Sequence, residues 1–325
     1  MPASKIGSRW NRPGYEGSLD FYRKDTGASL LTIAEGGLVG VPNPSGGGDY
    51  YVDNNAGVDA TGDGLSWATA WKTLATAITA VNARTGTSNY AARCRIFYKA
   101  DSETVNLAAL PQKTDIIGVG TCTAYPMASI KGNHAPLTAK YGCRFFNVQF
   151  IPATAAVLWT LIANNNGISF YGCQFVGAWS TVTATSAIST TAVELMNVIG
   201  CDFDGAFSAE VIKIGTGNAS GIKIVDNNIR GGASDGVYVA TGATFSGVNG
   251  KALIDNNRIY VALITINDVS QLALVTRNRC ISAAASGTGG VGAFVANTHL
   301  CSDNQITAAA ISFMYPLAFD ADGTT

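Results

Sequence analysis

The stretch GIKIVDNNIRGG (Gly221–Gly232) contains two isoleucines separated by one residue, then an asparagine, then a further isoleucine. The asparagine, Asn227, follows Ile224 by three positions and precedes Ile229 by two. In an extended chain, alternate side chains point to opposite faces of a sheet, so this spacing fits strands with one inward and one outward face. The same pattern of residues recurs in KALIDNNRIYVA, LALVTRNRCISA and HLCSDNQITAA. The chain therefore contains a structural repeat, and the repeat predicts its fold.

The repeats align in columns. Aligned on the asparagine, they share a slot that holds Val148, Cys173, Cys201, Asn227, Asn257, Asn278 and Asn304. Two positions after the slot stand Phe150, Phe175, Phe203, Ile229, Ile259, Cys280 and Ile306. Between these two columns lies a polar one, made of Gln149, Gln174, Asp202, Asn228, Arg258, Arg279 and Gln305. Successive slots are 25, 28, 26, 30, 21 and 26 residues apart, which indicates coils of constant strands joined by turns of variable length.

A column of like residues is what a parallel β-solenoid requires. Each coil lies about 4.8 Å above the previous one, so equivalent side chains stack directly over each other. A single buried asparagine without a partner would cost a few kcal/mol. Asparagines on four successive coils can instead bond to each other, so we expect an inner amide ladder with the phenylalanine and isoleucine stacks beside it.

These features resemble the right-handed parallel β-helix proteins of the pectate-lyase-like superfamily, in which inner asparagine ladders and aromatic or aliphatic stacks are common. The predicted fold is all-β: a single-stranded right-handed parallel β-helix (solenoid) over residues 93–325. A capping segment with an N-terminal α-helix is expected over residues 49–92, and a short arm with a hairpin over residues 1–48. The alternative is an ordinary β-sandwich in which the repeated phrases occur by chance.

Composition narrows the function classes. Charged residues make up 13% of the 325 residues and the net charge is -1, which gives no electrostatic reason to expect nucleic acid or an anionic membrane as a partner. No apolar run approaches the roughly 18 residues of a membrane span, and the first residues lack the apolar core of a signal peptide. The seven cysteines show no metal-ligand spacing, so we expect reduced core residues and no metal or other cofactor.

The segment before the repeats predicts a helical cap. Apolar residues fall at helical spacing from Trp67 to Val81, and Ser66 is a plausible N-cap. A helix here would cover the open end of the solenoid, whose strand edges would otherwise invite association. The preceding Asp59 and Asp63 lack the spacing of an EF-hand, so we expect them to bond to their own loop rather than to calcium.

The first 48 residues predict a small hairpin with a turn at Asp25–Gly27. So short a piece cannot build a core of its own. Its wording is similar to N-terminal segments of phage virion proteins, and the resemblance implies attachment to other virion proteins and a homotrimer. The candidate attachment residues are Trp10, Tyr15, Phe21 and Tyr22. A plain leader with a hairpin is the alternative.

Three acidic residues are the best candidates for catalysis. Asp202 and Asp204 lie two positions apart in CDFDG, and Glu210 follows them closely. Paired carboxylates serve as general acid and base in glycoside hydrolases. The alignment, however, sets Asp202 beside Asn228 and Asp204 beside Arg230, which is more typical of surface ion pairs. His134 is expected in a loop, and no motif for nucleophilic or metal-dependent hydrolysis occurs.

Three functions remain open. The first is a virion structural protein, made in the host cytoplasm: a β-helical capsid decoration, head fibre or tail spike anchored by residues 1–48. The second is a tail spike enzyme that degrades polysaccharide as a lyase or glycoside hydrolase. The third is a module that binds cell-surface polysaccharide without turnover. The aromatic residues considered for sugar stacking are Trp159, Trp179, Tyr238 and Tyr260.

Overall fold

In a computed structural model, the chain divides into two units, residues 1–46 and 47–325. The structure describes residues 6–11, 18–23, 29–33, 48–85, 93–100, 102–120, 128–137, 141–231, 235–245, 251–260, 263–266, 273–282, 291–292 and 300–308. The statements below concern these residues.

The first unit contains one antiparallel sheet of three strands. They are β1 (Ile6–Asn11), β2 (Ser18–Arg23) and β3 (Ser29–Ile33), with β2 in the centre. The sequence predicted the β2–β3 hairpin, and the structure adds β1, which pairs with β2 from Ile6 opposite Arg23 to Asn11 opposite Ser18.

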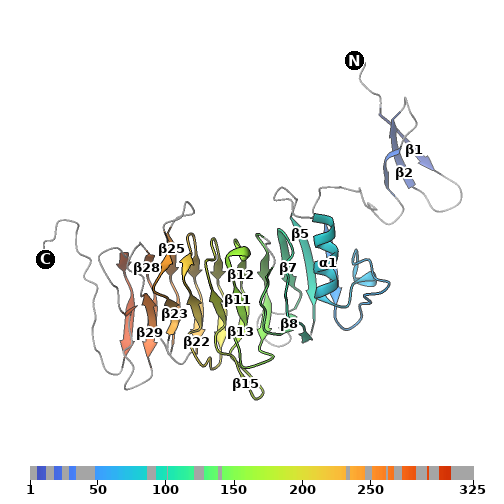
Figure 1. The fold of residues 1–325 in the computed structure, drawn as a ribbon. Coiled ribbons are helices and arrows are strands. Elements are labelled where there is room, and N and C mark those ends of the chain that lie inside the picture. The colour runs from blue at the N-terminus through green and yellow to red at the C-terminus, as the bar shows by residue number, and fades with distance from the viewer. Residues whose placement is uncertain are drawn as a thin grey trace. The chain divides into compact units, whose positions relative to one another are not determined.

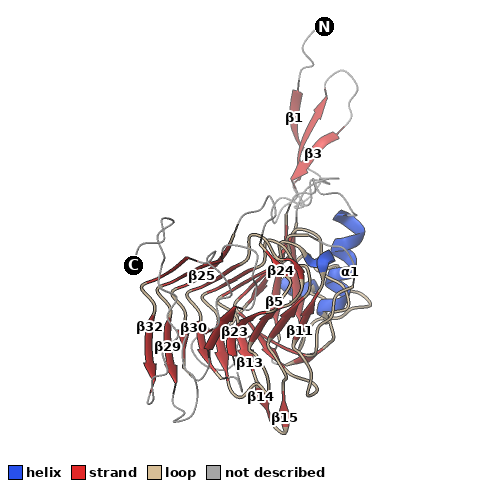
Figure 2. Cartoon of the chain, turned by 60° about the vertical axis from the view of Figure 1, so that its left-hand side comes forward, coloured by secondary structure: helices blue, strands red, loops and turns tan. Residues whose placement is uncertain are grey.

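The second unit is a parallel β-helix built from three sheets (Figures 1 and 2). Sheet I contains β4 (Asp49–Asp53), β5 (Cys94–Lys99), β7 (Thr114–Gly118), β9 (Arg144–Phe146), β12 (Ser169–Tyr171), β17 (Asn197–Ile199), β21 (Lys223–Val225), β25 (Ala252–Asp255), β28 (Ala273–Thr276) and β31 (Leu300–Ser302). Sheet II contains β6 (Glu103–Thr104), β8 (Ala128–Lys131), β10 (Val148–Ile151), β13 (Gln174–Val176), β18 (Asp202–Asp204), β22 (Asn228–Arg230), β26 (Arg258–Ile259), β29 (Arg279–Ser282) and β32 (Gln305–Ala308). Sheet III contains β11 (Trp159–Leu161), β16 (Ile188–Thr190), β19 (Ile212–Ile214), β23 (Asp235–Val239), β27 (Leu263–Ile266) and β30 (Val291–Gly292).

Short strands and one 3-10 turn lie in the segments that connect the three sheets. The hairpin of β14 (Ala178–Trp179) and β15 (Val182–Thr183) is antiparallel, whereas β20 (Gly217–Asn218) and β24 (Ala243–Thr244) pair in parallel. A 3-10 turn, η2, spans Ala163–Asn165.

The strand register matches the columns read from the sequence. In sheet II, Phe150 pairs with Phe175, Phe175 with Phe203, and Phe203 with Ile229. The two rings of Phe175 and Phe203 stack with centroids 4.6 Å apart and planes 6° apart. These side chains are fully buried, because alternation directs them into the solenoid. Ile306 lies opposite Cys280 in the last described pair of strands.

The slot lies at the corner between sheets I and II, and every coil turns that corner in the same way. The residue immediately before the slot has a positive φ in each of the aligned coils: Asn147, Gly172, Gly200, Asp226, Asn256, Arg277 and Asp303. Asparagine, aspartate and glycine adopt this left-handed conformation most easily, and most of the column consists of them. Arg277, with φ 53°, is the exception.

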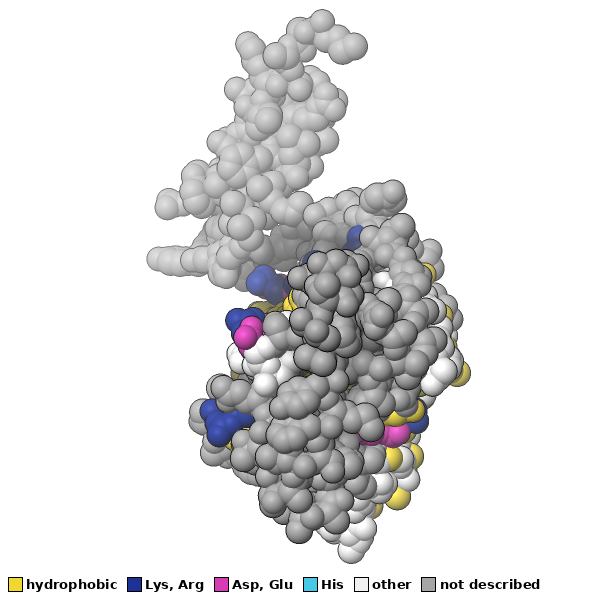
Figure 3. Space-filling model, turned by 90° about the vertical axis from the view of Figure 1, so that its left-hand side faces the viewer, with side chains coloured by type: hydrophobic (Ala, Val, Ile, Leu, Met, Phe, Trp, Pro, Cys, Tyr) yellow, Lys and Arg dark blue, Asp and Glu magenta, His cyan; other side chains and the backbone are white. Residues whose placement is uncertain are grey.

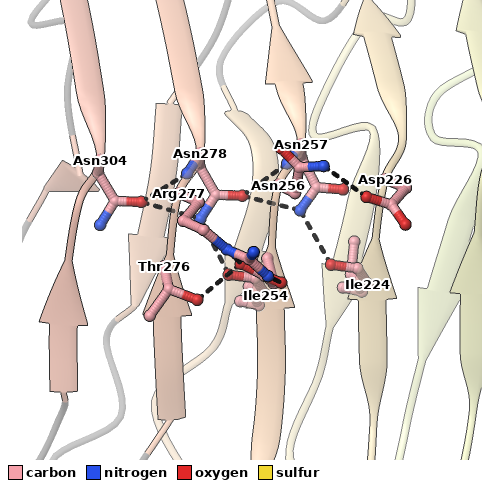
Figure 4. A network of polar contacts seen from close by, with 10 residues as sticks. Ile224, Asp226, Ile254, Asn256, Asn257, Thr276, Arg277, Asn278 and Asn304 are labelled. Atoms are coloured by element: carbon pink, nitrogen blue, oxygen red, sulfur yellow. Dashed lines mark hydrogen bonds and ion pairs between the residues drawn. The ribbon is translucent and has the colours of Figure 1, made fainter.

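The asparagines form a continuous ladder inside this corner (Figure 4). The Nδ2 atom of Asn227 donates to Oδ1 of Asn257 at 2.9 Å, and Asn257 donates in the same way to Asn278 at 2.8 Å and Asn278 to Asn304 at 3.0 Å. Each Oδ1 also accepts the backbone N–H of the slot residue one coil earlier, so that Asn227 accepts from Cys201 at 2.8 Å. The second N–H of each amide donates to a backbone carbonyl, as Asn257 does to Ile224 at 2.9 Å. The ladder therefore satisfies buried backbone groups as well as the amides themselves.

The structure of the cap differs from the sequence prediction in two respects. The predicted helix from Trp67 is interrupted: η1 (Trp67–Thr69) is a single 3-10 turn capped by Ser66, and α1 spans Leu74–Thr85. Between them, Trp71 forms a β-bridge to Val52, and its backbone N–H donates to Tyr51, so it cannot continue a helix.

The segment 49–92 also contributes to the solenoid itself, because it contains β4, which pairs along its length with β5. The coils therefore begin at Asp49 rather than at residue 93. Glu103, from the first strand of sheet II, holds the start of α1: its carboxylate accepts the Leu74 N–H at 3.0 Å. Buried Leu74, Ala77, Ile78 and Val81 join the same core as the strands.

We predict that Asn227→Ala lowers the free energy of unfolding by about 3 kcal/mol or more, because it leaves buried donors and acceptors on two neighbouring coils without partners. Asn228→Ala is the matched control, since Asn228 is the next residue but faces outward. It should cost less than about 1 kcal/mol. Urea unfolding followed by circular dichroism measures both, and equal losses would contradict an internal role for the ladder.

Candidate functional site

The outer face of sheet II carries a hydrogen-bonded column of polar side chains. Ser129 Oγ donates to Gln149 Oε1 at 2.6 Å, and Gln149 Nε2 donates to Gln174 Oε1 at 2.7 Å. Further along, Asn228 Nδ2 donates to Asp202 Oδ1 at 2.8 Å. This is the polar column of the sequence alignment, and the register places Arg258 and Arg279 next in it. Ser129 and Gln149 are buried, so the candidate functional surface is the part of the column from Gln174 to Arg279.

Asp202 and Asp204 lie together on this face, as neighbours on β18 with the buried Phe203 between them. Both face one cation: Arg230 Nη2 is 2.6 Å from Asp202 Oδ2 and 3.7 Å from Asp204 Oδ2. The Arg230 guanidinium, bonded first to Asp202, has its pKa raised further above its usual value. The two carboxylates are therefore partners of a positive charge on the next coil.

Glu210 does not belong to this group. It precedes β19 in sheet III, where its carboxylate lies 3.4 Å from Lys213 Nζ. The same Nζ atom lies 5.4 Å from the ring centre of Tyr238, in a cation–π contact. The sequence placed Glu210 near Asp204 by number, but the chain changes sheets between them.

The aromatic residues considered for sugar stacking do not form one platform. Trp159 is fully buried and packs against His134, Phe145 and Phe150, so it is unavailable to a ligand. That interpretation was wrong because Trp159 lies at an inward position of β11. The half-exposed Trp179, Tyr238 and Tyr260 belong to a hairpin, to sheet III and to the strand end after β26 respectively.

Sheet I carries a second outer column that the sequence analysis missed. Aromatic residues two positions before the slot stack outside the solenoid, with Phe146 and Tyr171 centroids 4.9 Å apart. Ion pairs lie beside them: Asp115 accepts from Arg144 at 2.6 Å and from Arg93 at 2.8 Å. The signal was present, since the position two before the slot is apolar in these coils, at Phe146, Tyr171, Ile199 and Val225.

His134 lies in the irregular segment after β8, as predicted, and its side chain is inside the solenoid. It is fully buried, and a single β-bridge joins it to Trp159. Its Nδ1 accepts the Leu107 N–H at 3.2 Å, so the neutral ring carries its proton on Nε2. Nε2 and the Trp159 Nε1 are buried without a partner among the residues described. Burial lowers the pKa of His134 to about 3.

The aspartates of the cap bond to their own loop. Asp59 accepts the backbone N–H groups of Lys72 and Thr73 at 2.9 and 3.0 Å. Hydrogen bonds from the Thr69 hydroxyl and the Leu65 N–H hold the pKa of Asp63 below its usual value. Across the part of the chain that the structure describes, no group of three or more metal-ligating side chains is found.

Two further predictions concern cysteines and the first unit. Cys94, Cys143, Cys173, Cys201 and Cys280 are free and buried. Burial raises the pKa of Cys280 to about 12.

Of the attachment residues, Tyr15 lies outside the described residues, and for Trp10, Phe21 and Tyr22 only the strand backbone is described. Among the helices described, none is long and apolar enough to cross a membrane.

No protein-family model matches this sequence, and a search of curated proteins finds no match. Among solved structures, the crystal structure of pectate lyase Pel9A resembles the fold, with a TM-score of 0.44 and 11% sequence identity. The similarity covers 82% of this chain and 78% of that chain. A similarity of this degree carries no information on activity, so the proposals below depend on this chain's own residues.

The burial of His134 predicts a specific response to acid. Its pKa is about 3 in the folded chain and about 6.5 when unfolded, so the unfolded state binds a proton first as the pH falls. The contribution of His134 to the free energy of unfolding is therefore fully present above about pH 6.5. It falls by about 1.4 kcal/mol per pH unit as the pH is lowered towards 3. Over this range, the wild type should lose unfolding free energy relative to the His134→Phe variant as the pH falls. A difference that stays constant with pH would contradict the assignment.

Proposed function

We propose that this chain is a structural protein of a phage virion: a β-helical projection, such as a capsid decoration, head fibre or tail spike. Residues 1–48 would anchor it to other virion proteins, and the projection would be a homotrimer. The observation that carries the proposal is the construction in two units, a small antiparallel sheet followed by a long solenoid.

The size of the first unit supports an anchoring role. Its strands have six, six and five residues. A sheet this small buries too little apolar surface to be stable alone, and pairing with another surface would supply what is missing. Residues 1–48 are therefore suited to docking on a larger body.

The solenoid supports a mechanical role. Its asparagine ladder, its stacked rings and its in-register strands join each coil to the next along the axis. Stability in such a repeat depends on the contacts between neighbouring coils. A rod of this kind holds its cross-section and can carry a surface away from the particle.

One observation favours a second candidate, a tail spike lyase or glycoside hydrolase. Asp202 and Asp204 lie on one outer face, and paired carboxylates can cleave glycosidic bonds. Catalysis by such a pair requires one group to act as an acid and the other as a base or nucleophile. Here the same guanidinium faces both carboxylates, which favours a structural ion pair.

Antibodies against residues 47–325 would test the virion proposal. In immuno-electron microscopy of particles from the source of the chain, we expect label on surface projections. A chain that lacks residues 1–46 should fold, as judged by circular dichroism, but should no longer co-sediment with particles. Absence of the chain from purified particles would contradict the proposal.

The enzyme candidate has its own test. Purified full-length chain incubated with capsular polysaccharides should release no reducing ends and no unsaturated sugar products. If products appear and both Asp202→Asn and Asp204→Asn abolish them, while Asp49→Asn does not, the enzyme is the correct function. Asp49 is a fair control because it is likewise an outer aspartate paired with an arginine.

A further inference from the structure

Two arginines on the outer face of sheet II differ from the other arginines of the solenoid. Every other arginine whose side chain the structure describes pairs with an aspartate: Arg93, Arg95, Arg144, Arg230 and Arg277. Arg258 and Arg279 are exposed, and neither forms an ion pair or hydrogen bond with any residue that the structure describes. Their charges are therefore not neutralised by the described part of the chain.

The register places these two charges side by side. Arg258 on β26 pairs with Arg279 on β29, and the buried Ile259 and Cys280 after them confirm that both arginines point outward. Neighbouring strands lie about 4.8 Å apart, so the side chains start one coil apart in the same column. Like charges directly opposite each other destabilise a sheet by about 0.2–1 kcal/mol. An anion between them would turn this repulsion into attraction.

The acids of this face are already engaged elsewhere. Asn228 separates Arg258 from Asp202 in the column, and Asp202 bonds to Asn228 and to Arg230. Asp255, on the other side of the corner, is held by Arg277, which lowers the pKa of that carboxyl group. Asp204, the other aspartate of β18, also lies beside Arg230, at 3.7 Å. None of these three aspartates is therefore free to act as the counter-ion.

Figure 3 views the C-terminal end of the solenoid, and Lys and Arg side chains lie there in separate small groups. Some have an acidic side chain next to them, while a group at the left edge has none beside it in this view.

We propose that Arg258 and Arg279 together bind an oxyanion, a carboxylate or phosphate group, on the outer face of sheet II. Guanidinium groups present planar forks of N–H donors that match both kinds of oxyanion. Two forks one coil apart can clasp one such group or follow two groups along a polymer. Tyr260, half-exposed and two residues after Arg258, adds a ring beside the site. This site goes beyond the proposed virion role and does not depend on it.

Titration calorimetry of the full-length chain at low salt tests the site with three probes. They are inorganic phosphate, a uronic acid oligosaccharide and a neutral glucan oligosaccharide of equal length. We expect binding of phosphate, of the uronic acid chain or of both, and none of the neutral glucan. Tighter binding of the uronic acid chain assigns the oxyanion to a polymer, and tighter binding of phosphate assigns it to a small ion. Failure of both anions to bind overturns the proposal.

Arg258→Gln and Arg279→Gln should each weaken anion binding at least about tenfold, because each removes one charged fork. Arg95→Gln is the matched control: Arg95 is equally a surface arginine, but Asp49 occupies its guanidinium. It should leave binding unchanged, and an equal loss in this variant would overturn the proposal in favour of a general charge effect.

The melting temperature without anions gives a second readout. The doubly substituted chain, R258Q/R279Q, should melt at or above the wild-type temperature, because the repulsion between the two charges is gone. The anion that binds in the titration should raise the melting temperature of the wild type more than that of the double variant, which shows only the general effect of the added salt. A lower melting temperature for the double variant in anion-free buffer would contradict the proposal, since it would show that the arginines stabilise the fold itself.

Discussion

The hydrogen bonds between buried amides at one corner of the coil are the interaction on which the rest of this structure depends. Asn227, Asn257 and Asn278 each join the coil before to the coil after, through side chain and backbone together, and Asn304 joins the last described coil to Asn278. An amide inside an apolar rod is stable only in this exact register, because any shift would leave donors and acceptors buried without partners. The ladder therefore aligns sheets I and II, and the columns of the outer faces follow from that alignment.

The same corner explains the backbone conformation of the coils. A turn sharp enough to bring the chain from one sheet to the next places the residue before the slot at positive φ. Asparagine, aspartate and glycine occupy most of these positions, as their low cost in this conformation requires. Arg277 accepts the strain, and its side chain forms an ion pair with Asp255 on the neighbouring coil. Backbone geometry and surface charge are thus linked at this corner.

Much of the solenoid could be predicted from the sequence because its order is one-dimensional. Residues that repeat at each coil, such as Phe175 and Phe203, reveal their partners through spacing alone. The cap was harder, since Trp71 lies at helical spacing yet forms a bridge to Val52, and only the folded chain brings these residues together. Trp159 was misjudged for a related reason: sheet III has no slot residue, so nothing in the repeat shows which of its side chains face inward. The position of Glu210 was misjudged for the same reason, because the chain passes from sheet II to sheet III between Asp204 and Glu210.

The coils differ in length almost entirely away from the ladder. The antiparallel hairpin of β14 and β15 emerges after β13 and returns before β16, while the strands on either side keep their register. Extra residues in such a hairpin cost only the small loss of entropy that a longer loop brings. New segments can therefore be grafted at this point without disturbing the interior, which makes the rod a scaffold whose exterior can diversify while its framework stays constant.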